Sequence, residues 1–170
     1  AGPQGPTGPQ GPQGPPGPGL DPNLTHICSI SWSHGGREIV AGIREKGLLI
    51  AFDGLGVDKR DFHDRSVTVL ISHEQKVWQG LVTCWCEVAL TRMPKILSKF
   101  CDLSSTISDP KATDKFVNAV QLKFTDPGMV PNKGVIRVII NGDFIRDAKS
   151  NGLDADHLPP WFPSKNYKSG

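Results

Sequence analysis

The chain lacks the features that mark several broad classes of protein. Its 170 residues contain no apolar run of membrane-spanning length, so we expect no membrane span. The net charge of +2 at pH 7 gives no reason to expect nucleic acid or an anionic membrane as a partner. The Gly-x-Ser-x-Gly, His-Glu-x-x-His and phosphate-loop motifs are all absent. We therefore expect no enzymatic activity and no cofactor.

The first 19 residues also lack charge, since they contain no Lys, Arg, Asp or Glu. Glycine instead stands at every third position and is followed by proline in six consecutive triplets, at Gly2, Gly5, Gly8, Gly11, Gly14 and Gly17. A flexible Pro/Gly linker has the same composition but needs no strict period. The segment resembles collagen, in which only glycine fits at the crowded axis of three polyproline-type strands.

This resemblance implies a homotrimer, or one chain of a heterotrimer, with three parallel strands over residues 1–19. At roughly 3 Å of rise per residue the stalk would be about 50 Å long. Because so short a stalk is not expected to hold three chains together unaided, we expect a further trimerising element or an external grip on the stalk. Gln4, Gln10 and Gln13 stand third in their triplets, which resembles the collagen-like segments of bacteria and phages.

The rest of the chain shows the pattern of an all-β domain. Short alternating or buried apolar runs are separated by Gly, Pro and Asp turns, which is typical of a β-sandwich. We expect strands at residues 24–32, 47–53, 66–72, 77–88, 119–125 and 135–140, with residues 90–113 irregular. The predicted domain covers residues 20–157, and a Pro-rich aromatic tail follows at residues 158–170.

A second resemblance concerns residues 47–154. A hydrophobic strand ends in Phe52-Asp53, a Ser-Val-Thr-Val strand begins at Ser66, and a closing strand leads into Gly142-Asp143 and then Gly152-Leu153. This order is similar to that of bacterial Ig-like domains of S-layer and surface proteins, with a long insertion at residues 90–118. The resemblance implies an Ig-like β-sandwich that serves as a structural or spacer module, with no catalytic residues to carry over.

The four cysteines are the most reactive side chains of the sequence: Cys28, Cys84, Cys86 and Cys101. On an exterior protein four cysteines favour two disulfides. Cys84 and Cys86 share one face of a predicted strand, so we expect each to reach outward, to Cys28 and Cys101 or to another chain. Free buried thiols are an alternative. A further alternative is a zinc site that combines His26 and Cys28 with Cys84 and Cys86.

Together these observations predict an extracellular or cell-surface structural protein, a trimeric collagen-like subunit of an appendage, fibre or filament. We further hypothesise that the stalk docks into the head of a neighbouring trimer and so polymerises the protein. The alternative is a trimeric collagen-stalked adhesin or phage-type tail-fibre tip that binds glycan or protein. Four tryptophans, Trp32, Trp78, Trp85 and Trp161, could stack on sugars in such a head, although a place in the core explains them more simply.

Overall fold

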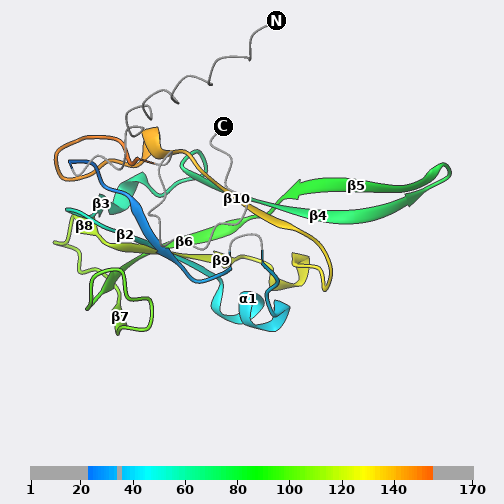
Figure 1. Cartoon of the computed structure of the whole chain (residues 1–170), viewed down its shortest axis with the longest axis horizontal. Helices are drawn as coiled ribbons and strands as arrows, with labels where there is room; N and C mark the ends of the chain where they lie inside the picture. Colours follow the sequence, from blue (N-terminus) through cyan, green and yellow to red (C-terminus); the bar gives the residue numbers. More distant parts are fainter. Residues whose placement is uncertain (1–22, 34–35, 155–170) are drawn as a thin grey trace, which may run out of the picture.

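The computed structural model describes residues 23–33 and 36–154, and these form an all-β domain (Figure 1). The collagen-like segment and the Pro-rich tail lie outside the described residues. The strands are β1 (Ile27–Ile30), β2 (Leu48–Phe52), β3 (Val57–Asp58), β4 (Val67–Val77), β5 (Gly80–Glu87), β6 (Leu90–Leu97), β7 (Ile107–Ser108), β8 (Phe116–Val117), β9 (Ala119–Phe124) and β10 (Ile136–Ile140). One α-helix, α1 (Val40–Lys46), and three short 3-10 turns, Lys59–Asp61, Pro127–Met129 and Gly142–Phe144, complete the described elements. None of the described helices is long and apolar enough to cross a bilayer.

The strands form two main antiparallel sheets that share one hydrophobic core. The first sheet has the order β1-β2-β9-β6-β7 and the second has the order β10-β4-β5, while β3 and β8 pair separately. Ile50 and Phe52 of β2 pack in the same cluster as Val67 and Val69 of β4. All five residues of β2 are buried, because β2 lies between β1 and β9 and the second sheet covers its inner face. This burial explains why its sequence is a continuous apolar run.

Four of the predicted strands are confirmed with shifts of their ends. The runs predicted at residues 24–32, 47–53, 119–125 and 135–140 correspond to β1, β2, β9 and β10. In each, apolar side chains facing the shared core impose the pattern that the sequence displays.

The region from residue 66 to residue 88 differs from the prediction. We expected one strand to end at Ser72 and the next to begin at Val77, but β4 continues to Val77 and pairs with β5 across the Trp78-Gln79 turn. Beyond the core this hairpin depends on its backbone ladder rather than on burial, so polar residues are tolerated in both strands. The exposed residues His73 to Lys76 therefore carry no apolar alternation that would reveal the extension of β4, whereas β5 lies within the strand predicted at residues 77–88.

The prediction of irregular structure over residues 90–113 is wrong in its first third, where β6 pairs with β9 from Leu90 to Lys95. Arg92, Pro94 and Lys95 hide this strand in the sequence. Pro94 is accommodated because β7 pairs only with Ile96 and Leu97, so the other side of β6 is an open edge at that point.

The β4–β5 hairpin extends well beyond the two sheets, as Figure 1 shows. Ile71 and Ser72 are buried at its base, whereas the hairpin residues beyond them are mostly exposed. We call residues 73–86 the arm.

Candidate interaction site

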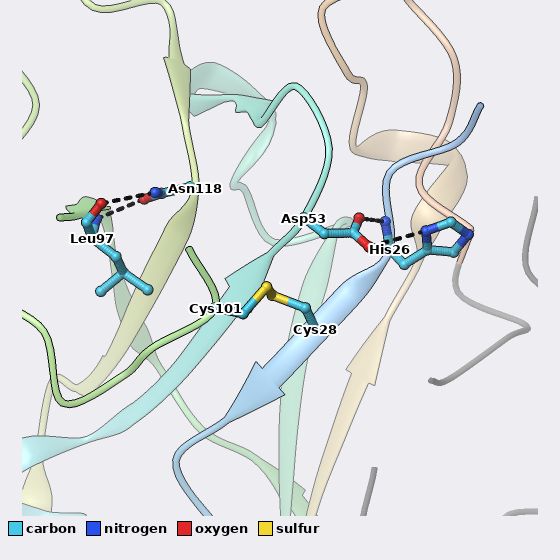
Figure 2. The surroundings of a disulfide bond; sticks show 6 residues. All are labelled: His26, Cys28, Asp53, Leu97, Cys101 and Asn118. Atoms are coloured by element: carbon cyan, nitrogen blue, oxygen red, sulfur yellow. Dashed lines mark hydrogen bonds and ion pairs between the residues drawn. A yellow bond between two sulfur atoms is a disulfide. The ribbon is translucent and has the colours of Figure 1, made fainter. Parts of the chain in front are cut away.

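Cys28 and Cys101 form a disulfide that fastens β1 to the loop after β6 (Figure 2). Their Cα atoms are 5.7 Å apart, and 73 positions separate them in sequence. The prediction that these two cysteines pair with Cys84 and Cys86 is therefore wrong within one chain. The reason is topological: Cys84 and Cys86 lie on β5 of the second sheet, and both are free thiols. Their pairing with another chain stays a prediction.

The alternative zinc site does not assemble either. The sulfur of Cys28 is consumed by the disulfide, and Cys84 and Cys86 lie in the arm rather than beside His26. Across the described part of the chain, no group of three or more His, Cys, Asp or Glu side chains is placed to hold a metal ion.

His26 instead connects three segments of the domain. Its backbone N–H donates to Asp53 Oδ1 at 2.5 Å, and its Nδ1 lies 3.3 Å from Asp53 Oδ2 (Figure 2). Its Nε2 lies 3.5 Å from Asp154 Oδ2, and the backbone N–H of Asp154 donates to the carbonyl of Thr25. His26 is buried, so this contact holds the start of β1 against the end of β2 and against the last described residues. Its role is structural.

Two carboxylates near β3 are held by arginines. Arg60 Nη2 lies 2.8 Å from Asp58 Oδ2, and Arg146 Nη2 lies 2.8 Å from Asp61 Oδ1. The side-chain hydrogen bond from Arg60 lowers the pKa of Asp58 to about 2, and that from Arg146 lowers the pKa of Asp61. The pair of Asp61 and Arg146 joins segments that are 85 positions apart in the chain.

These depressed pKa values predict how stability depends on pH. A carboxyl group whose pKa is lower in the folded state stabilises that state above its unfolded pKa, and the contribution is lost as the group becomes protonated. We expect the urea midpoint to fall as the pH is lowered from about 4 to about 2, because the pKa of Asp58 is about 2 in the folded state and 3.8 in an unperturbed aspartate. An Asp58→Asn, Asp61→Asn variant should lose much less over the same interval. An equal fall in both proteins would contradict this assignment.

The arm has two faces. One continues the core face of β4 and carries His73, Gln75, Cys84 and Cys86 together with the exposed Val77 and Val82, with each cysteine beside a polar partner across the hairpin. The Sγ of Cys84 donates to Gln75 Oε1 at 3.5 Å, and the Sγ of Cys86 lies 3.8 Å from His73 Nδ1. Both thiols therefore lie at the surface in polar surroundings, and neither is a buried core cysteine.

The opposite face and the tip of the arm carry large apolar side chains. Trp78 at the turn is 93% exposed, Leu81 is 68% exposed, and Trp85 is 40% exposed with the guanidinium of Arg137 4.7 Å from its ring centre. The expectation that Trp78 and Trp85 belong to the core is wrong. The available signal was Gly80, because a short glycine-containing segment between two apolar runs can mark a hairpin.

The described surface thus offers a candidate interaction site. It is a projecting hairpin with exposed tryptophans and two free thiols, supported by a disulfide-fastened domain. No protein family model, curated protein or solved structure matches the chain.

Proposed function

We propose that the protein is an extracellular structural protein, a trimeric collagen-like subunit of a surface appendage, fibre or filament. The observation that carries this proposal is the unbroken Gly-Pro-X repeat of residues 2–19. A strand of this type hydrogen-bonds only to two others, so its strict glycine period has a physical reason only in a triple helix. The stalk then supplies the three-fold arrangement, and the β domain supplies a head.

An Ig-like assignment for the head is supported by the order of its strands. In an Ig domain one sheet has the order A-B-E-D, and the other contains C and F, with C′ beside C in the variable type. If β1, β2, β4 and β5 are taken as A, B, C and C′, then β6, β9 and β10 become D, E and F, and both sheet orders agree. Its disulfide departs from the B–F bridge of antibody domains, since Cys28 lies on β1 and Cys101 after β6. Ig-like modules of this kind act as rigid spacers in surface proteins.

A location outside the reducing cytoplasm is supported by the disulfide between Cys28 and Cys101. Disulfides form and persist in secreted and surface-exposed proteins, and they are rare where thiol reductants are abundant. A fibre subunit exposed to heat and proteases also gains from a cross-link that ties distant parts of its chain.

The arm supports an assembly role over that of an isolated monomer. Exposed apolar side chains gathered on one projecting element mark an interaction surface. In the arm these are Val77, Trp78, Leu81, Val82 and Trp85. A hairpin of this kind stabilises the protein little by itself, so its apolar residues are better explained by contact with another chain.

The second candidate is a collagen-stalked adhesin or tail-fibre tip, and the exposed ring of Trp78 favours it. An aromatic ring at a loop tip can stack on a sugar or fill a pocket of a protein partner. Three such tips on one stalk would gain avidity. In this second candidate the protein is still a trimer, but the trimers do not assemble into a filament.

Electron microscopy of the full chain separates the two functions. We expect regular filaments, because a structural subunit must have contacts that propagate between trimers. A chain without residues 1–19 should form no filaments if the stalk docks into a neighbouring head. Discrete three-headed particles would favour the adhesin or tail-fibre tip. Single heads would contradict both proposed functions. Filaments that survive the deletion would contradict the docking of the stalk.

A further inference from the structure

Strand β5 is the edge of the second sheet, and its free side is ready to pair with another strand. The backbone N–H of Val88 donates to the carbonyl of Val69, and the register then places Cys86 and Cys84 in hydrogen-bonded pairs with β4. Because these pairs alternate along an antiparallel ladder, Thr83, Trp85 and Glu87 turn their N–H and C=O groups away from β4.

The composition of β5 does not protect this edge. Natural edge strands are blunted by lysine, proline or a bulge, yet β5 reads Gly-Leu-Val-Thr-Cys-Trp-Cys-Glu and carries a single charge, at Glu87. Within the described residues no strand pairs with its outer side. The edge is therefore suited to the addition of a strand.

We propose that β5 pairs antiparallel with β5 of a second copy of the chain, about a two-fold axis at Trp85, and that Cys84 of each copy forms a disulfide with Cys86 of the other. In this register Trp85 lies opposite its counterpart, and the outward backbone groups of both residues bond to each other. Thr83 then lies opposite Glu87 of the second copy, which satisfies the other outward groups.

The same register brings the thiols together without further adjustment. Cys84 lies opposite Cys86 of the second copy in a non-hydrogen-bonded pair, where Cα atoms are about 4.5 Å apart. Disulfides span Cα distances of roughly 4.4–6.8 Å, so both symmetric pairs are within range. Cys84 and Cys86 share one face of β5, so the two disulfides lie side by side.

A second copy is the occupant that the sequence itself implies. In the proposed homotrimer the Gly-Pro-X repeat of residues 2–19 brings several copies of the chain to one place. A contact centred on one residue is also self-complementary, as a two-fold interface must be. Because parallel strands around a three-fold axis have no two-fold relation, the arms join chains of different trimers. The choice of occupant and this last step rest on the proposed function, whereas the register of the β5 contact does not.

The oxidation requires an external oxidant, and a low-molecular-weight disulfide such as oxidised glutathione is sufficient. The thiolate of one cysteine attacks this disulfide, forms a mixed disulfide and releases one glutathione thiolate. The facing thiolate of the second copy then attacks the protein sulfur and releases the second glutathione. Each new bond thus consumes two protein thiols, and the two electrons and two protons pass to two reduced glutathione molecules.

The register is tested by complementation between two single variants of the full chain. Cys84→Ser retains only Cys86, and Cys86→Ser retains only Cys84, so neither variant should cross-link with itself. After treatment with oxidised glutathione, an equimolar mixture should contain about tenfold more covalent dimer on a non-reducing gel than either variant alone, because only the mixed pair places two thiols within range. Equal cross-linking by one variant alone would overturn the register.

Mass spectrometry of the unaltered chain provides the second readout. The tryptic peptide of residues 77–92 contains both cysteines, so the proposed contact yields two copies of this peptide joined together. A single peptide lighter by two hydrogens would show a Cys84–Cys86 bond within one chain and would overturn the proposal.

The strand pairing has its own matched variants. Trp85→Pro removes the outward N–H at the centre of the contact without removing a bond to β4, whereas Trp85→Val keeps it. We expect cross-linking to be lost with proline and retained with valine, while the disulfide of Cys28 and Cys101 stays intact in both. Equal cross-linking in the two variants would contradict pairing through this edge.

The arm contact and the trimer can fail separately. A cross-linked dimer of otherwise monomeric chains would contradict the trimer and leave the arm contact standing. Trimers that form no cross-links would contradict the arm contact and leave the trimer standing.

Discussion

Replacement of both Cys28 and Cys101 by alanine should lower the free energy of unfolding by about 4 kcal/mol, because their disulfide closes a long loop of the chain. The bridge joins residues 73 positions apart, so its loss releases a large loop in the unfolded chain. It also removes the link between β1, which is an edge strand of the first sheet, and the loop after β6. A loss of this size is a large fraction of the stability of an ordinary domain.

The matched control is the replacement of Cys84 and Cys86 by alanine, since these thiols lie in the arm outside the core. Under conditions where the arms are not cross-linked, this control should change the free energy of unfolding by less than about 0.5 kcal/mol. Urea titrations followed by far-ultraviolet circular dichroism measure both variants. Equal losses in the two would mean that the bridge of Cys28 and Cys101 does not stabilise the domain.

The parts of the fold that burial dictates could be predicted from the sequence. Ile50 and Val120 are fully buried on adjacent strands of the first sheet, and their apolar runs are readable as strands without any knowledge of their neighbours. The general prediction of an all-β domain is confirmed for the same reason.

The outer part of β4 and the whole of β6 could not be predicted because these strands are held by backbone pairing, whereas β5 lies within the strand predicted at residues 77–88. His73 to Lys76 are polar and exposed, so nothing in their side chains distinguishes a strand from a loop. Arg92 in β6 is instead explained by a long-range contact, since its guanidinium donates to the carbonyl of Val67 on β4. Such contacts depend on which strands meet, and a single sequence does not contain that information in local form.

The cysteine pairing failed for a related reason. Their i, i+2 spacing correctly placed Cys84 and Cys86 on one face of a strand, but it gave no information on the sheet to which that strand belongs. The disulfide of Cys28 and Cys101 requires β1 and the end of β6 to lie close together, which depends on the complete strand order. What remained of the prediction, a link from Cys84 and Cys86 to another chain, agrees with the free thiols of the arm.

The stalk should be the part of the chain most sensitive to a single methyl group. In the proposed triple helix Gly8, first in its triplet, takes the axis position, where any Cβ would separate the three strands, whereas Gln10, third in the same triplet, takes an outward position. We expect Gly8→Ala to raise the concentration at which trimers dissociate by tenfold or more, which is about 2.8 kcal/mol or more per trimer because the dissociation constant of a trimer scales with the square of that concentration. Gln10→Ala should leave it nearly unchanged.

Sedimentation equilibrium of the full chain, in a Cys84→Ser, Cys86→Ser background that excludes cross-links between arms, tests the central claim most directly. The account predicts a mass three times the 18.4 kDa of one chain, or a multiple of that trimer, and a weaker trimer for Gly8→Ala alone. A single-chain mass for the unaltered stalk, or equal behaviour of Gly8→Ala and Gln10→Ala, would contradict it.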